Sequence, residues 1–152
     1  MECYVSESAN CFLQSLINQS LRYGLKSPDT DLYDFGFGEL TTLDHKGMIK
    51  ERCMYSIHAT CRFKIIWRNG EGRIDEYYED TPCEKFHFEV QKLVGLKVKK
   101  IALSEKNDLW LDLGDCWIVF ATFENGEESW RCLTMDTQKP HLVASNAWVE
   151  FS

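Results

Sequence analysis

His58 and Cys61 are the first residues whose types and spacing suggest catalysis, because an imidazole beside a thiol can act as base and nucleophile. Both lie in a run from residue 55 to 65 in which apolar and polar residues alternate, which is the period of a β-strand. Residues three apart on a strand point to opposite faces. We therefore expect Cys61 to be buried and His58 to be half-exposed, and we predict no catalytic dyad.

An acidic and aromatic segment is the candidate for binding a protein partner. Tyrosines give an interface large contact area at low entropy cost, and carboxylates steer a basic partner toward it. The alternative is a solvated strand end whose acids favour the positive end of the helix that follows. The residues of this segment are Asp75, Glu76, Tyr77, Tyr78, Glu79 and Asp80.

Glu128 and Trp130 belong to a second cluster that suits ligand binding. On a strand these two side chains share one face, and a tryptophan beside a carboxylate can line a pocket. A tryptophan packed in the core next to a hairpin turn is the commoner arrangement. Together with His58 they form the candidate ligand-binding set, placed in a cleft between two halves of the chain.

We predict no metal ion and no cofactor. A structural zinc site needs cysteine or histidine pairs at short spacing, and the sequence has none. A set assembled from distant residues, such as Cys53, His45 and His87, stays open as the alternative. Gly36 and Gly38 are followed by polar residues rather than by a helix, so they do not indicate a phosphate-binding loop.

Composition narrows the class of partner. The chain has 152 residues and a formal net charge of -7, which fits one domain with a real core. The acidic excess argues against unaided binding to the phosphate backbone of nucleic acid and favours a basic protein as the partner. The longest apolar run, residues 116–121, is far shorter than the roughly 20 residues of a membrane helix.

The seven cysteines indicate a reducing compartment. They are odd in number and lack close pairs, and the first residues show neither the positive charge nor the apolar run of a signal peptide. Free thiols in the cytoplasm are the simplest interpretation.

The elements that must position these residues are predicted from a repeat. Leu16-Ile17-Asn18 recurs 77 residues later as Leu93-Val94-Gly95, and Asp31-Leu32-Tyr33 recurs as Asp108-Leu109-Trp110. In each half an apolar helix end meets a residue that tolerates positive φ, and alternating strands follow. We predict an α+β fold with a largely antiparallel sheet and two short helices. It forms a single domain built from two related helix-plus-strands units, about 10–79 and 82–151.

Local signals place the two helices near residues 10–18 and 82–94. Thr81, Pro82 and Glu84 form a capping-box pattern, with threonine as the cap and proline at the first helical position. Asn18 and Gly95 stand where a left-handed residue ends each helix.

Two Asn-Gly pairs predict hairpins, because this dipeptide favours the type I′ turn. Asn69-Gly70 predicts a hairpin of residues 55–67 with 72–79, and Asn125-Gly126 predicts one of residues 116–123 with 127–134. Residues 38–52 lack periodicity and are either an exposed loop or an extended hairpin.

Several short motifs together resemble a family of small uncharacterised bacterial proteins. They are Leu16-Ile17 with Phe35-Gly36, the strand over residues 55–65, Glu128-Ser129-Trp130-Arg131 and His141-Leu142-Val143. The family pattern is a leucine-histidine-x-glutamine-cysteine strand with a later glutamate-x-tryptophan-arginine motif; here Thr60 stands in place of the glutamine. Some of these proteins look like immunity proteins, and the resemblance implies no established activity.

The preferred hypothesis is a non-enzymatic protein-interaction module that binds a basic partner through residues 75–80. The alternative is a small-ligand-binding protein or enzyme with a cleft between the two halves, where His58, Glu128 and Trp130 converge.

Overall fold

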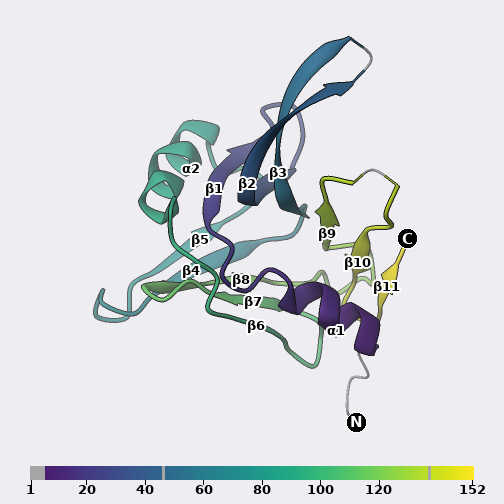
Figure 1. Ribbon diagram of the computed structural model, residues 1–152. Coiled ribbons are helices and arrows are strands. Elements are labelled where there is room, and N and C mark those ends of the chain that lie inside the picture. The colour runs from purple at the N-terminus through teal and green to yellow at the C-terminus, as the bar shows by residue number, and fades with distance from the viewer. Residues whose placement is uncertain (1–5, 46, 137) are drawn as a thin grey trace.

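The chain folds into two antiparallel sheets and two short helices, which confirms the predicted α+β class (Figure 1). The computed structural model describes residues 6–45, 47–136 and 138–152. The helices are α1 (Glu7–Gln14) and α2 (Cys83–Val90), and a 3-10 turn, η1 (Gln91–Leu93), follows α2. None of the helices in these ranges has the length and apolar character needed to cross a bilayer.

The sheets contain six and five strands. The six-stranded sheet has the order β1 (Leu21–Lys26), β2 (Tyr33–His45), β3 (Met48–Ala59), β9 (Trp130–Thr134), β10 (Leu142–Ala144) and β11 (Val149–Phe151). The five-stranded sheet has the order β5 (Ile74–Tyr77), β4 (Phe63–Trp67), β8 (Cys116–Phe120), β7 (Leu109–Asp112) and β6 (Lys100–Leu103).

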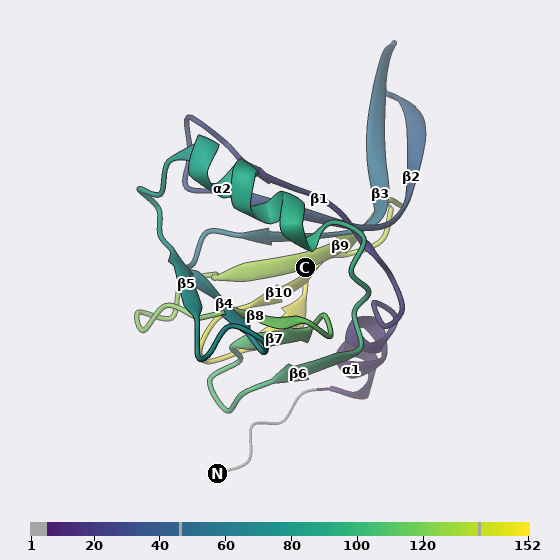
Figure 2. The same cartoon turned by 90° about the vertical axis from the view of Figure 1, so that its left-hand side faces the viewer.

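The inner faces of the two sheets share one aromatic core. The ring of Phe35 on β2 lies 5.3 Å from that of Phe63 on β4 and 5.4 Å from that of Phe120 on β8. Period-two alternation puts these rings inward and leaves the intervening side chains on the outer faces. Each helix packs against strands of the sheets. α2 packs on β1, and α1 contacts β6 and β11 (Figure 2).

The predicted single strand over residues 55–65 is wrong, because the chain changes sheets inside it. β3 ends at Ala59 and β4 begins at Phe63 in the other sheet. Ala59, Cys61 and Phe63 are all buried in the same core, so the alternation of apolar residues continues through the crossover and conceals it. Only the later part of the predicted hairpin exists, as the antiparallel pair of β4 and β5.

The predicted hairpin of residues 116–123 with 127–134 is also wrong. β8 and β9 lie in different sheets, and the segment that holds Asn125-Gly126 is a second crossover. Gly126 has a positive φ of 80°, and the Asn125 side chain accepts a hydrogen bond from the backbone of Glu127. The dipeptide therefore makes a turn without returning the chain to the same sheet.

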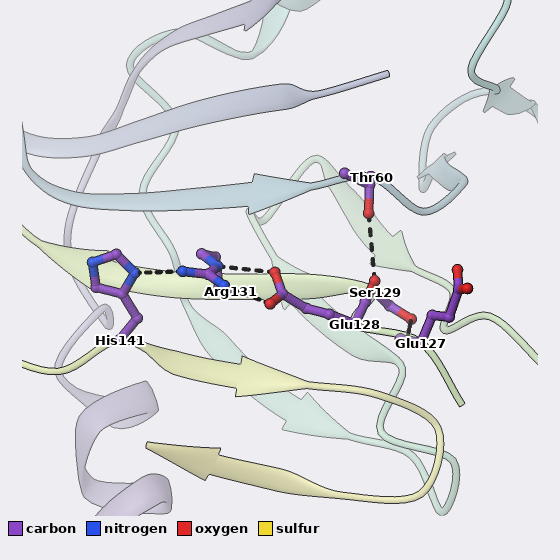
Figure 3. Close-up of polar contacts among 6 residues, drawn as sticks. All are labelled: Thr60, Glu127, Glu128, Ser129, Arg131 and His141. Carbon is purple, nitrogen blue, oxygen red and sulfur yellow. Dashed lines mark hydrogen bonds and ion pairs between the residues drawn. The ribbon is translucent and has the colours of Figure 1, made fainter. Parts of the chain in front are cut away.

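The two crossovers meet at Ser129, which is completely buried (Figure 3). Its carbonyl oxygen accepts hydrogen bonds from the backbone N–H groups of Thr60 and Cys61, at 3.1 and 3.3 Å. Its hydroxyl accepts one from the Phe123 N–H at 2.9 Å, and its own N–H donates to the Ala144 carbonyl at 2.8 Å. One residue thus ties both crossovers to the six-stranded sheet.

Most of the segment 38–52 is an extended hairpin, not a loop. Residues 38–45 belong to β2 and residues 48–52 to β3, and the outer halves of these strands rise away from the body (Figure 1). The pairing shifts register between Phe37 and Leu40, and Gly38 there has a φ of 88°. This irregularity bends the hairpin.

The cap of α2 and the turn between β4 and β5 differ from the predictions. Pro82 is the N-cap of α2 and makes no side-chain cap bond, because the Thr81 hydroxyl instead accepts a hydrogen bond from the Tyr78 N–H at 2.8 Å. The turn between β4 and β5 has its positive φ angles at Glu71 and Gly72 rather than at Asn69-Gly70. The predicted left-handed residues Asn18 and Gly95 are confirmed, with φ of 73° and 94°.

The two halves pair reciprocally where they meet. Asn18 donates its N–H to the Val98 carbonyl and Gly95 donates to the Leu21 carbonyl, both at 2.8 Å. The order β1-β2-β3-β9-β10 in one sheet matches β6-β7-β8-β4-β5 in the other, with the halves exchanged. A duplicated unit would give this arrangement, and the repeat of 10–79 in 82–151 stays a prediction.

We predict that Gly95→Ala lowers the free energy of unfolding by about 1–2 kcal/mol, because a φ of 94° strains an L residue. A Cβ at this position meets no atom within 4 Å, so the loss comes from the backbone rather than from a clash. Asn18→Gly is the matched control and should stay within about 0.5 kcal/mol of the wild type. Urea denaturation measures both, and an unchanged Gly95→Ala would contradict the assignment.

Candidate functional site

The acidic segment runs along β5, an edge strand, and into the turn before α2. Tyr77 does not contribute to its surface. That side chain is 1% exposed, its ring stacks on Phe63 at 4.8 Å, and its hydroxyl donates a hydrogen bond to Glu89. Burial and the Glu89 carboxylate raise the pKa of Tyr77, so it stays a protonated core residue.

Two of the acids in this segment already have partners. The Asp75 carboxylate accepts a hydrogen bond from the Trp67 indole at 2.9 Å and pairs with Arg73 at 3.0 Å. Glu76 accepts one from the Tyr78 hydroxyl at 2.6 Å. Of the predicted partner-binding residues only Tyr77 is buried; Asp75 and Tyr78 are half-exposed, and Glu76, Glu79 and Asp80 are exposed.

A buried lysine fixes the end of this segment. Lys26 on β1 is 7% exposed, and its ammonium donates to the backbone carbonyls of Glu79, at 2.7 Å, and Thr81. It also lies 5.5 Å from the centre of the Tyr33 ring, in a cation–π contact. The buried ammonium group of Lys26 thus fixes the backbone at Glu79 from the interior of the protein. The sequence pattern missed this residue, because buried lysines are rare.

Glu79 lines a surface hollow of about 540 Å³ together with two acids from other segments, Asp31 and Glu124. Arg62 is the cation among the described lining residues, and its guanidinium lies 3.7 Å from the Glu79 carboxylate. A hydrogen bond from its own backbone N–H, helped by Arg62, lowers the pKa of Glu79 and keeps it ionised. The hollow is therefore acidic and partly neutralised by one exposed arginine.

The candidate ligand-binding residues lie on the outer face of the six-stranded sheet. His58 on β3 is directly opposite Asp34 on β2 and Arg131 on β9. Glu128 accepts two hydrogen bonds from the Arg131 guanidinium, at 2.9 and 2.5 Å, and the remaining end of that guanidinium lies 2.9 Å from His141 Nδ1 (Figure 3). The structure brings His58 and Glu128 onto one face through Arg131.

Trp130 does not join them, which corrects the predicted convergence. Its side chain is fully buried, and its indole N–H donates to the Asn107 carbonyl at 3.0 Å. Glu128 lies before β9 begins, so strand alternation does not place it on the face of Trp130. The tryptophan is a core residue, and the outer face carries no tryptophan from this cluster.

Asp34, His58 and Ser56 are the residue types of a hydrolase triad, yet the arrangement differs from one. His58 Nε2 is the nitrogen that faces Asp34, at 3.4 Å, and no hydrogen bond joins Ser56 to His58 in the described part of the chain. A triad needs the histidine to bridge both partners. These three side chains are therefore not arranged as a triad.

Two of the buried thiols are poor nucleophiles. Burial raises the pKa of Cys61 and of Cys116 to about 12, so both stay protonated. Cys61 is buried and His58 is half-exposed, as the sequence predicts. The six cysteines that the structure describes are free.

No group of three metal-ligating side chains occurs among the described residues. Of the distant set, His87 Nε2 accepts a hydrogen bond from the Lys26 N–H and Cys53 is buried, whereas the side chain of His45 lies outside the described part of the chain.

Sequence reasoning missed a groove of about 670 Å³ on the outer face of β1, β2 and β3. Asp34, Arg22 and Arg52 line it. The available signal was the alternation in β2, where Asp34 stands between the buried residues Tyr33 and Phe35. The register that puts Asp34 opposite His58 is not visible in a single sequence.

Neither the family models, the curated proteins nor the solved structures that were compared with the chain matched it. The resemblance to small bacterial proteins therefore stays a hypothesis.

We predict that His141 titrates below its usual range, because burial, the Arg131 charge and His58 all lower its pKa. An arginine only donates hydrogen bonds, so His141 Nδ1 is the unprotonated acceptor. The unfolded chain binds this proton near pH 6.5 and the folded chain at a lower pH, so the stability contribution is complete above pH 6.5 and is lost as the pH falls.

An NMR titration of the His141 ring measures this. Arg131→Gln should raise the His141 pKa, and Arg131→Lys, which keeps the charge, should raise it less. A wild-type His141 that titrates at the ordinary value would refute the assignment.

Proposed function

We propose that the chain is a non-enzymatic protein-interaction module that binds a basic protein partner at the acidic hollow beside the end of β5. The observation that supports this most directly is the meeting of Asp31, Glu79 and Glu124, from three separate segments, around one hollow. Carboxylates gathered in this way attract a lysine or arginine side chain and steer its approach.

Arg62 in the hollow can be displaced from Glu79 by a cation of the partner. The side chains of Arg62 and Glu79 are 62% and 50% exposed, and an exposed pair at 3.7 Å contributes little to stability. A partner's guanidinium can replace Arg62 at Glu79 with little loss. Arg62 keeps a second contact in that case, because its guanidinium lies 4.8 Å from the centre of the Tyr78 ring.

A smaller hollow of about 220 Å³ adjoins the first and provides apolar contact. Tyr78 and Val119 line it together with Glu76 and Lys64. The hydrogen bond to Glu76 and the stacked Arg62 hold Tyr78 in place, so its ring is ordered before binding. We infer that the partner presents a basic residue next to an apolar one.

The setting that we propose is the cytoplasm of a bacterium. Free thiols fit a reducing compartment. A net charge of -7 fits a basic protein rather than nucleic acid as the partner. The resemblance to proteins that look immunity-like makes a basic toxin one such partner.

The alternative, a small-ligand binder or enzyme with His58, Glu128 and Trp130 around one cleft between the halves, is less well supported. Trp130 is in the core, and Glu128 is occupied by Arg131.

We predict that Glu79→Lys weakens binding of a hexa-arginine peptide by about tenfold, because it converts one of the acids of the hollow into a cation. Glu150→Lys is the matched control, since it makes the same charge change on β11, in the other sheet, and should leave the affinity near the wild-type value.

Isothermal titration calorimetry at low ionic strength gives the affinities, and NMR shift mapping should centre on Asp31, Glu79 and Glu124. Equal weakening by both variants would mean that only net charge matters, and it would reject the hollow as the site.

A further inference from the structure

The groove on the outer face of β1, β2 and β3 is a second hollow, separate from the acidic one. It measures about 670 Å³, within the range of small-ligand sites. It lies where the β2–β3 hairpin bends away from the sheet (Figure 1). Its lining residues are Arg22, Tyr23, Leu25, Asp34, Leu40, Glu51, Arg52, Ser56 and His58.

One end of the groove holds the carboxylate of Asp34, one oxygen of which has no hydrogen-bond donor among the described residues. Oδ1 of Asp34 is enclosed and accepts no hydrogen bond from the described residues, and His58 Nε2 lies 3.4 Å from it. The Asp34 side chain is 28% exposed and lines the groove, so a donor in the groove meets the exposed part of the carboxylate rather than the enclosed Oδ1. A buried or half-buried carboxylate gains most from a charged N–H donor.

The middle of the groove is apolar and shaped by a glycine. The Tyr23 ring lies against Gly36, where a Cβ would come within 2.2 Å of the ring. Leu25 and Leu40, 52% and 48% exposed, extend this apolar surface. Exposed leucines beside a tyrosine provide a surface for an apolar side chain.

The other end carries two arginines. Arg22 donates Nε to the Gly38 carbonyl at 3.0 Å, which anchors its guanidinium at the bend. Arg52 lines the groove from β3, where it is opposite Thr41, three residues beyond Gly38 on β2. Guanidinium groups are suited to a carboxylate, and the presence of Glu51 and Asp34 disfavours a ligand with several negative charges.

We propose that this groove binds a short peptide with free termini in an extended conformation. Its terminal ammonium pairs with Asp34 beside Leu25, its middle side chain packs on Tyr23, and its terminal carboxylate pairs with Arg22 and Arg52. Arg22 is anchored at Gly38, which lies four residues from Asp34 on β2, and this corresponds to about 13 Å. An extended peptide spans about 3.3–3.6 Å per residue, so three or four residues fit.

The test is calorimetry of the full chain with the tripeptide alanyl-leucyl-alanine. Asp34→Asn should weaken binding about tenfold or more, and N-acetylation of the peptide should do the same to the wild type, because each removes one partner of the charged pair. Acetylated peptide should then bind Asp34→Asn no more weakly than the free peptide does. Asp115→Asn, in the turn between β7 and β8, is the control and should bind as the wild type.

The carboxylate end is tested in the same way with Arg52→Gln and a peptide amide. An amide that binds as tightly as the acid would overturn the assignment of the arginines to the terminal carboxylate. Absence of binding by the wild type at millimolar peptide, or equal binding by Asp34→Asn, would overturn the proposal. The peptide modifications keep the test valid even if a variant fails to fold.

This proposal is independent of the acidic hollow. Glu79→Lys should leave tripeptide affinity unchanged, so one proposal can fail while the other holds.

Discussion

The rest of the structure depends on the constraint that both crossovers meet at Ser129. Its carbonyl oxygen accepts two backbone hydrogen bonds from the β3–β4 crossover, and its hydroxyl accepts one from the β8–β9 crossover. These groups are buried, and unpaired buried polar groups cost about 1–3 kcal/mol each. The paths of both crossovers are therefore fixed together, and each sheet must contain strands from both halves of the chain.

This exchange of strands creates the acidic hollow and the polar row on the outer face of the six-stranded sheet. The acidic hollow is lined by Thr60 and Arg62 from the first crossover and by Glu124 from the second, so it exists because the crossovers run side by side. On the outer face, the pairing of β3 with β9 puts His58 of the first half beside Arg131 of the second. Neither set of neighbours could form within one half alone.

Burial along a strand and positive φ angles could be predicted from the sequence. Which strands pair, and in which register, could not. Alternation correctly separated the buried Cys61 from the half-exposed His58, and the left-handed conformations of Asn18 and Gly95 followed from residue type. The crossover at Thr60 was hidden, because Ala59, Cys61 and Phe63 keep the same alternation while the chain changes sheets. Asn125-Gly126 specified a turn, but a turn does not state which strand follows it.

The candidate sites were harder to predict, because contacts between residues far apart in the sequence decide which charged side chains are paired and which are available. Lys26 and Arg131 are held by several hydrogen bonds, to backbone carbonyls in one case and to Glu128 and His141 in the other. Breaking the contacts of Lys26, which is 7% exposed, would leave a desolvated charge, whereas Arg131 is 32% exposed and holds Glu128 and His141 by hydrogen bonds.

Arg62 differs from them, because its pair with Glu79 is long and exposed and costs little to exchange. A cationic side chain of a partner most easily displaces the cation that the protein itself holds most weakly. Among Lys26, Arg131 and Arg62, that condition is met by Arg62 at the acidic hollow. The row Glu128–Arg131–His141, although richer in polar contacts, is therefore the weaker candidate for recognition and the stronger one for fixing β9 against its neighbours.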